Sequence, residues 1–325
     1  MDTKTVLVTG IGGNVGQGIL RNIDSLNLPI NIIGCDIASF TPGNHLCHKT
    51  YKVPYSYDEN YISEINKIIE AEKIDLIIPS TDYEVYYLAL NKSELKTKII
   101  TCDKEVTKLF LDKYLTYNYF SENNIPFSKS WLPKDYDFSC ESIIAKPREG
   151  RGSRGIVKNP KDLSVFGDDY MIQPLHEGIE ITTAVYVNKH GKLHGIFSME
   201  RKLENGTTSQ TIVNDTYDEK FKEIIQKIID LGGIRGSINL QSIVDEEGNI
   251  YPFEVNCRIS GTNSIRHQFG FQDVKYTIQE YLLDQEADQI KPIKGIATRI
   301  LLDVIYPEAT NFDDLNNKSA KHSIY

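Results

Sequence analysis

The sequence predicts an α/β domain built on a doubly wound parallel sheet, followed by a mixed α+β region. Strand-like apolar runs alternate with amphipathic helical segments over about the first 105 residues. Glycines cluster directly after the first of these strands. Beyond Pro126 the pattern changes to hairpins joined by glycine-containing turns. With 325 residues, the chain is long enough for two or three domains.

The first domain is predicted element by element from this alternation. TVLVT at 5–9 is the first strand, and GIGGNVGQGILRNI after it predicts a turn and a helix. INIIGCDI, with Asp36 near its end, is the second strand. DLIIPST follows the amphipathic helix ENYISEINKIIEAEKI, and KIITCD is a fourth strand. Strands separated by helices are typical of a parallel sheet with helical crossovers.

The second region begins with one long predicted helix, DKEVTKLFLDKYLTYNYFSENN, which ends before Pro126. SIIAKPREGRGSRGIVKN then predicts a strand, a glycine-rich loop and a second strand. Further antiparallel strands follow in DYMIQPLHEG and in IEITTAVYVNKHGKLHGIFSMERK, which turns at His190 and Gly191. A helix at 218–231 precedes the hairpin SINLQSIVDEEGNIYPFEVN.

Composition and charge exclude several classes of function. The net charge of −9 offers no general attraction to nucleic acid or to an anionic membrane, and no apolar run approaches the roughly 18 residues of a membrane span. The five cysteines are odd in number, widely spaced and without a C-x-x-C pair, which indicates a reducing compartment and a cytoplasmic protein. The HLCH group at His45, Cys47 and His48 lacks the well-spaced ligands of a zinc site.

The glycines after the first strand support one alternative function, an NAD(P)-binding oxidoreductase. Gly10, Gly13 and Gly16 would let the backbone approach a phosphate, and Asp36, 20 residues after Gly16, would bind a ribose hydroxyl. Strict G-x-G-x-x-G spacing needs a glycine where Val15 stands, and no tyrosine precedes a lysine by four residues. The glycines are equally typical of a tight strand-to-helix turn.

A second glycine cluster predicts a phosphate-binding loop. Lys146 ends an apolar strand, and the loop after it holds three glycines and three arginines: Gly150, Gly152, Gly155, Arg148, Arg151 and Arg154. Open backbone amides and cations suit the tail of a triphosphate. The Walker A pattern is absent, because Ile156 follows Gly155. The alternative interpretation is a solvated basic hairpin.

The stretch NIYPFEVNCRISGT predicts a metal site. Strand alternation places Glu254, Asn256 and Arg258 on one face, opposite an apolar face. An even-numbered turn centred between 247 and 248 would put Gln241 opposite Glu254 and Asn239 opposite Asn256. Such oxygen donors suit Mg²⁺, which also takes nucleotide phosphates as ligands. The alternative is an edge hairpin with a solvated polar face.

In order and spacing, these motifs resemble the ATP-grasp ligases, and most of all the group of the carbamoyl-phosphate synthase large subunit and its stand-alone relatives. The resemblance implies an N-terminal Rossmann-like domain over 1–107 and a small ATP-grasp subdomain over 108–172, in which the loop REGRGSRG is a lid over the triphosphate. It implies a C-terminal subdomain over 173–325, which contains the hairpin SINLQSIVDEEGNIYPFEVN, called the metal hairpin below. The two subdomains would grip the nucleotide between them. The chain is much shorter than a complete carbamoyl-phosphate synthase large subunit, so it lacks the second synthetase half.

The resemblance also assigns roles to residues. It implies that ATP contacts Lys113, Lys146, Arg151, Gly152, Ser153, Gln173, Pro174, Leu175, Glu180 and Gln241. It implies two Mg²⁺ ions, for which Mn²⁺ can substitute, with ligands at Gln241, Glu254 and Asn256. It also implies that Lys146 and Arg258 are catalytic cations. The substrate pocket is expected beyond the carboxyl ends of the N-terminal strands, with Arg201, Arg266 and His267 as contacts or as plain surface residues.

The implied activity is a carboxylate–amine ligase. ATP would phosphorylate a small carboxylic acid to an acyl phosphate, and an amine would displace the phosphate. Dimers are frequent in the family, so a homodimer is one alternative, but the sequence leaves the oligomeric state open. Two other functions compete: the oxidoreductase described above, and a nucleotide-binding module without catalysis, which the presence of Lys113, Lys146, Glu254 and Asn256 argues against.

Overall fold

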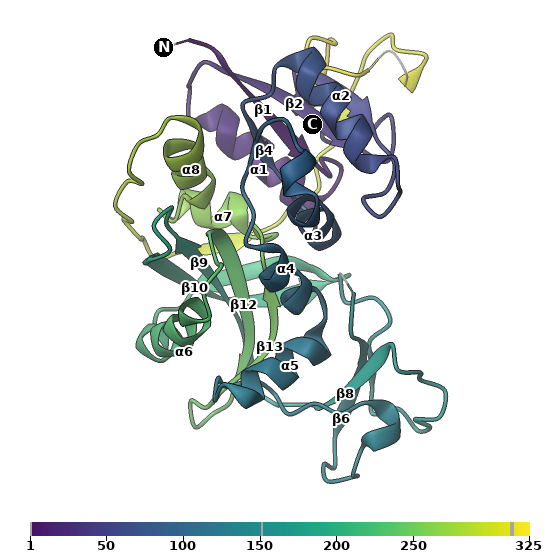
Figure 1. Ribbon diagram of the computed structural model, residues 1–325, viewed down its shortest axis with the longest axis vertical. Coiled ribbons are helices and arrows are strands. Elements are labelled where there is room, and N and C mark those ends of the chain that lie inside the picture. The colour runs from purple at the N-terminus through teal and green to yellow at the C-terminus, as the bar shows by residue number, and fades with distance from the viewer. Residues whose placement is uncertain (1, 151, 313–314) are drawn as a thin grey trace.

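The computed structural model describes residues 2–150, 152–312 and 315–325. The N-terminal part is a parallel sheet covered by helices, the middle of the chain forms a small sheet and a large antiparallel sheet below it, and the C-terminal segment lies back beside the N-terminal part (Figure 1). This arrangement confirms the predicted fold class. Arg151, an expected ATP contact, and residues 313–314 lie outside the described residues.

The N-terminal sheet has five parallel strands in the order β3-β2-β1-β4-β5. Their bounds are β1 Lys4–Thr9, β2 Ile30–Asp36, β3 Lys49–Lys52, β4 Leu76–Ile78 and β5 Lys98–Ile99. The crossover helices are α1 Asn14–Ser25, α2 Tyr61–Glu72 and α3 Asp82–Leu90, with short 3-10 turns at η1 Asn44–Leu46 and η2 Lys92–Glu94. The apolar residues of β1 and β4 are buried between the helices, which explains their unbroken hydrophobic sequence.

The edge strand β3 was not predicted. Its sequence, KTYK, has neither an apolar run nor a buried residue. Pairing with β2 from Ile33 to Asp36 makes it a strand, so its structure depends on tertiary context more than on its own propensity.

The single long helix predicted over 103–124 is wrong. It divides into α4 (Lys104–Leu111) and α5 (Lys113–Glu122), because Asp112 adopts an extended conformation with φ −104° and ψ 110°. The Asp112 carboxylate accepts hydrogen bonds from the backbone N–H groups of Tyr114, at 2.8 Å, and Leu115, at 3.1 Å, as an N-cap does. The break places Lys113 at the start of a new helix.

A small three-stranded sheet in the order β7-β6-β8 carries the glycine-rich loop. It consists of β6 Ile143–Pro147, β7 Val157–Lys158 and β8 Tyr170–Pro174, preceded by the turn η3 Pro133–Asp135. Its own core contains Trp131, Tyr136, Ile143, Ala145 and Ile172. The predicted order of strand, loop and strand is confirmed.

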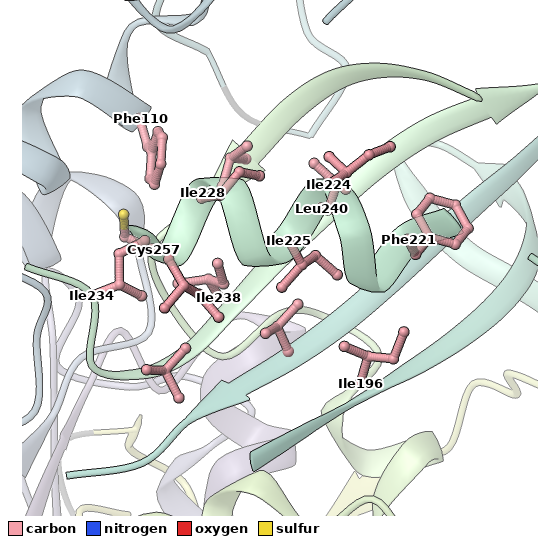
Figure 2. Packing of buried hydrophobic residues seen from close by; sticks show 14 of the residues in the cluster. Phe110, Ile196, Phe221, Ile224, Ile225, Ile228, Ile234, Ile238, Leu240 and Cys257 are labelled. Carbon is pink, nitrogen blue, oxygen red and sulfur yellow. The ribbon is translucent and has the colours of Figure 1, made fainter. Parts of the chain in front are cut away.

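The large antiparallel sheet has the order β13-β12-β9-β10-β11-β14. Its strands are β9 Ile179–Val187, β10 Leu193–Glu204, β11 Thr207–Val213, β12 Gly236–Val244, β13 Ile250–Asn256 and β14 Ile296–Thr298. Helix α6 (Asp218–Asp230) packs its apolar face on one side of this sheet, as Figure 2 shows. Phe221, Ile225 and Ile228 are fully buried there, and each contributes about 1.5–3 kcal/mol through the hydrophobic effect.

Two short helices, α7 (Asn263–Gln268) and α8 (Asp273–Thr277), follow β13 and contact α1, and α8 continues into the π-helical turn η4 (Ile278–Leu282). The last strands are β15 Val304–Ile305 and β16 Ser323–Ile324. The C-terminal segment returns to the N-terminal domain, where Asn316 O accepts from Thr50 N at 2.9 Å and Lys318 N donates to Cys47 O at 2.6 Å. Among the described residues, no helix is long and apolar enough to cross a membrane.

Candidate active site

The hairpin of β12 and β13 has the predicted register. Gln241 lies opposite Glu254, and Asn239 lies opposite Asn256. The turn, however, is not even-numbered: Val244 pairs with Ile250, which leaves a loop of odd length. The register shifts between Gln241 and Ser242, where Phe253 forms a bulge. The bulge adds back the residue that the turn lacks, so the polar side chains still face each other.

Glu254 lies between the two lysines singled out from the sequence. Lys113 Nζ is 3.7 Å from its carboxylate, and the nearly buried Lys146 donates from Nζ to Phe253 O at 3.2 Å. Burial alone would raise the pKa of Glu254, but Lys113, Lys146 and a hydrogen bond from Asn256 together hold it below its usual value. Burial, assisted by Lys113, lowers the pKa of Lys146 to about 7. The carboxylate therefore stays ionised in a strongly cationic setting.

A chain of amide hydrogen bonds extends from Glu254 across the hairpin. Asn256 Nδ2 donates to Glu254 Oε1, and Gln241 Nε2 donates to Asn256 Oδ1, both at 2.9 Å. Arg201 on β10 donates to Gln241 Oε1 and, through Nε at 2.9 Å, to Glu180. Arg201, expected as a substrate contact, thus belongs to the same polar network as the expected metal and ribose residues.

Asn239 is separate from this chain. Its Oδ1 accepts from Thr182 Oγ1 at 2.9 Å, and its buried Nδ2 has no hydrogen-bond partner among the described residues. Its side chain therefore links β12 to the neighbouring strand β9.

The donor set fits a hard divalent ion. It supplies one ionised carboxylate, from Glu254, and the amide oxygens of Asn256 and Gln241. Within the described part of the chain there is no cluster of three or more His, Cys, Asp or Glu side chains that could bind a metal by itself. Mg²⁺ commonly binds with one or two carboxylates and completes its coordination with substrate phosphates and water. Glu254, Asn256 and Gln241 would hold it here.

Arg258 does not reach Glu254 directly. Its Nη2 and Nε donate to Asp82 Oδ2 at 2.7 and 3.1 Å, and Asp82 is the first residue of α3 in the N-terminal domain. Both side chains are largely buried, with 14% and 22% exposure. The expected catalytic cation is thus held at the boundary between the domains, at the carboxyl end of β4.

The lid, REGRGSRG at 148–155, is described except for residue 151; it is anchored at its base and contacts a hairpin through Gly152. Lys113 N donates to Arg148 O at 3.0 Å, and Lys113 Nζ donates to Gly150 O at 3.3 Å. Gly152 and Ser153 have positive φ values of 62° and 56°. A Cβ on Gly206, in the turn between β10 and β11, would lie 2.2 Å from Gly152 O, so the lid tip packs directly on that turn.

Gln173, Pro174 and Leu175, the expected adenine contacts, lie at the end of β8 and directly after it. Two of their polar groups already have hydrogen-bond partners within the protein. The buried Gln173 donates from Nε2 to Ser130 Oγ at 2.9 Å, and Leu175 N donates to Ser142 O at 3.0 Å. Pro174 and Leu175 are half-buried. The Gln173 amide and the Leu175 N–H are therefore satisfied within the protein, and Glu180 is paired with Arg201.

Arg266 and His267, both expected as substrate contacts, are buried in the protein. Arg266 is 1% exposed and donates from Nη2 to Asp273 at 2.5 Å and from Nη1 to Ser260 Oγ at 2.8 Å. Arg266 is therefore not a surface residue, and it has no guanidinium nitrogen left for a ligand, because Nε, Nη1 and Nη2 all donate to protein oxygens. His267 is also buried, with Nε2 3.4 Å from Ser25 Oγ.

The N-terminal glycines serve close packing. A Cβ on Gly16 would lie 2.4 Å from Gly10 O, and Gly12 N donates to Asp36 Oδ2 at 2.9 Å. Asp36, the expected ribose ligand of a dinucleotide, is therefore bound to the loop itself. This geometry favours the tight-turn interpretation of the glycines over the oxidoreductase.

Family models match the chain in two consecutive blocks. Residues 6–102 match the PylC-like N-terminal domain, and residues 110–262 match the ATP-grasp domain. The second block contains Lys113, Lys146, the lid and the metal hairpin. The chain contains an ATP-grasp domain. The narrower likeness to the carbamoyl-phosphate synthase group, and the boundaries at 107 and 172, stay predictions.

Two curated relatives of the chain are tyramine–L-glutamate ligases. The protein from Methanocaldococcus fervens is 26% identical over 211 residues, covering 63% of this chain and 66% of that protein. The protein from Methanocaldococcus jannaschii is 24% identical over 226 residues, covering 67% of each.

Solved structures share the fold at low sequence identity. N5-carboxyaminoimidazole synthetase from Staphylococcus aureus, solved with ADP, has a TM-score of 0.76 and 16% identity, covering 92% of this chain and 82% of that chain. The biotin carboxylase domain of 2-oxoglutarate carboxylase from Hydrogenobacter thermophilus, solved with MgADP, has a TM-score of 0.71 and 17% identity, covering 97% and 76%. Both likenesses confirm the ATP-grasp architecture.

Proposed function

We propose that the protein is a Mg-ATP-dependent ligase that joins a carboxylic acid to an amine. The observation that carries this proposal is the ionised Glu254, set between Lys113 and Lys146 and linked through Asn256 to Gln241. Cations beside a single carboxylate suit a metal-bound polyphosphate, and two curated relatives are named as ligases that join an amine, tyramine, to L-glutamate.

The chemistry follows from charge placement. A carboxylate oxygen of the acid attacks the γ-phosphorus of ATP, the bond to the bridging oxygen breaks, and ADP leaves with an acyl phosphate formed. The amine nitrogen then attacks the acyl carbon, inorganic phosphate leaves, and the nitrogen releases a proton. Lys113 and Lys146 bind the phosphate oxygens, while Arg258, oriented by Asp82, neutralises the charge on the transferred group.

Mg²⁺ supplies charge neutralisation and orientation of the phosphates when it is bound. We propose that Glu254, Asn256 and Gln241 are its ligands. We further propose that the site binds two ions and that Mn²⁺ can replace Mg²⁺ there. The lid residues Gly152 and Ser153 would cover the triphosphate. All five cysteines are free thiols, so we place the reaction in the cytoplasm.

The deciding experiment measures ADP release across a matrix of small acids and amines, with mass spectrometry of the products. We expect one acid–amine pair to give ADP, phosphate and a product lighter by one water than the pair. ADP release without an amide product, or none with any pair, would contradict the ligase.

A thermal shift with Mg-ATP tests the site itself. Glu254→Gln should lose the Mg²⁺-dependent stabilisation by ATP, because an amide cannot supply the anionic ligand. The matched control is Glu246→Gln, an exposed glutamate at the turn of the same hairpin, which should bind like the native protein. Stabilisation by NADH and none by Mg-ATP would instead favour the oxidoreductase.

A further inference from the structure

Most of the arginines that lie at least partly inside the protein are paired with an acid. Ion pairs join Arg148 to Asp112, Arg201 to Glu180, Arg258 to Asp82 and Arg266 to Asp273. Arg299, in the segment just after β14, is different. In residues 2–150, 152–312 and 315–325, no carboxylate lies within ion-pair distance of it, although its guanidinium is partly buried.

The Arg299 guanidinium is only half satisfied. Nη2 donates to Gly261 O at 2.8 Å, whereas Nη1 is shielded from solvent and has no partner among the described residues. A carbonyl oxygen does not neutralise a cation. Burial, and then the charge of Arg21, lower the pKa of Arg299. A partly buried charge without an acidic partner is destabilising, and an anionic ligand would supply the missing negative charge.

The surroundings are rich in donors. Asn14, Gln17 and Arg21 follow one face of α1 at helical spacing, and Arg21 Nη2 donates to Gln17 Oε1 at 3.1 Å. A Cβ on Gly261 would lie 2.9 Å from Asn14 Nδ2, so the Asn14 amide also borders Gly261. In a protein of net charge −9, two arginines here lack an acidic partner within the described chain.

The position of Arg299 is fixed, and its guanidinium contacts the loop that follows β13. Its backbone N–H donates to Ser209 O at 2.8 Å, which extends the pairing of β14 with β11. Gly261 lies three residues beyond Arg258, in the loop that leaves the metal hairpin. A group bound at Arg299 therefore sits beside the loop that carries the proposed catalytic cation.

We propose that Arg299, with Arg21 and Asn14 beside it, binds a second anionic group of the acid substrate, so that the substrate is a diacid activated at only one of its carboxylates. A guanidinium fork matches a carboxylate in two parallel hydrogen bonds. This inference rests on the proposed ligase function and narrows its substrate class. Arg266, a contact expected from the sequence, offers no such unpaired donor, because its Nε, Nη1 and Nη2 all donate to protein oxygens.

Matched pairs of acids test the proposal in the full-length protein. The pairs are succinate, glutarate, L-aspartate and L-glutamate, each against the monoamide that lacks the second charge. We expect the native protein with Mg-ATP to prefer at least one diacid over its monoamide in kcat/KM for ADP release. Arg299→Gln should reduce kcat/KM for that diacid by about 10- to 100-fold and leave the monoamide unchanged.

Two further variants separate charge from structure. Arg299→Lys should keep part of the preference, because it keeps the charge but loses the fork. Arg235→Gln removes another arginine whose Nη1 bonds to a carbonyl, Ile234 O at 2.6 Å, and should keep the native preference. An equal loss on diacid and monoamide in Arg299→Gln, or no preference in the native protein, overturns the proposal.

Binding gives a readout that does not need turnover. Diacids should raise the Tm of the native protein and of Arg235→Gln more than their monoamides do, and this difference should vanish in Arg299→Gln. If the diacids stabilise through Arg299 but no acid supports ADP release, the ligase function fails and the anion site stands. If inorganic phosphate alone stabilises through Arg299 and no diacid does, the site binds a free anion and the substrate proposal is wrong.

Discussion

At the scale of single residues, Lys146 shows how burial prepares a side chain for a charged ligand. Its ammonium group lies inside the protein, over the Phe253 ring at 4.9 Å and beside Lys113. Burial first, and Lys113 second, lower its pKa to about 7, although Glu254 and Glu180 act in the opposite direction. A bound triphosphate would favour the charged form, so binding and protonation are coupled.

The sign of this coupling gives a prediction. Below pH 7 Lys146 is already charged in the free protein, and above pH 7 it must take up a proton when ATP binds. Apparent ATP affinity should therefore fall as pH rises from 7, by at most about tenfold per pH unit. Calorimetry at pH 8 in buffers of different ionisation enthalpy should detect proton uptake. The exposed control Lys129→Gln should keep this uptake, and Lys146→Gln should lose it; equal uptake in both would contradict the assignment.

How far the residues of the site could be predicted depended on the distance over which they act. Strand alternation was enough to bring Gln241, Glu254 and Asn256 together, because that pattern is local. The pairing of Arg258 with Asp82 joins residues 176 positions apart, and no local pattern indicates it. No local pattern indicates a role for Arg299 either, because only the folded structure shows that its Nη1 has no hydrogen-bond partner.

At the scale of elements, the metal hairpin combines two irregularities that cancel. The odd-length turn alone would have rotated Glu254 and Asn256 away from Gln241 and Asn239, because one residue of slip exchanges the faces of a strand. The bulge at Phe253 restores the register and leaves the Phe253 carbonyl to accept from Lys146. The sequence predicts the strands and their faces, but bulge and turn length depend on backbone geometry.

The wrong prediction of one long helix over 103–124 has its physical cause in a single side chain. Asp112 ends α4 by capping α5 with its own side chain, a choice that competes with continuing the helix and that hydrophobic periodicity does not reveal. Its carboxylate also pairs with Arg148 at the base of the lid, at 2.5 Å. The helix break and the lid are thus stabilised by the same side chain.

The contact between the lid and the β10–β11 turn predicts the effect of one methyl group. Gly206→Ala would place Cβ 2.2 Å from Gly152 O and should push the lid away, which raises the dissociation rate of ATP and exposes the lid to trypsin. Gly232→Ala is the matched control, since Gly232 has a similar φ of 81° but nothing within 4 Å.

Both substitutions carry the same backbone strain of about 1 kcal/mol, so stability should fall alike. Stopped-flow release of a fluorescent ATP analogue and limited proteolysis would separate them. If both variants release nucleotide at the same rate, the contact between Gly206 and Gly152 does not hold the lid.

At the scale of the whole molecule, the proposed active site takes residues from both of the regions that the family models match. The metal hairpin belongs to the ATP-grasp domain, while Asp82, which holds Arg258, begins a helix of the PylC-like domain. The orientation of a proposed catalytic cation therefore depends on how the domains are joined.

Asp82→Asn should lower kcat while the KM for ATP stays within about twofold, because a neutral amide orients Arg258 less strongly. The matched control is Asp75→Asn, which removes an ion pair with Lys4 at the other end of β4, within one domain. Steady-state kinetics of both variants, checked by thermal melting, make the comparison. A rise in the KM for ATP with unchanged kcat would place Asp82 in nucleotide binding instead.

The return of the C-terminal segment to the edge of the first sheet affects the order of biosynthesis. The backbone N–H of Thr50, within the edge strand β3, donates to the carbonyl oxygen of Asn316, 266 residues later. A nascent chain therefore exposes an unfinished β-edge until residue 316 has left the ribosome, and such edges are prone to wrong pairing.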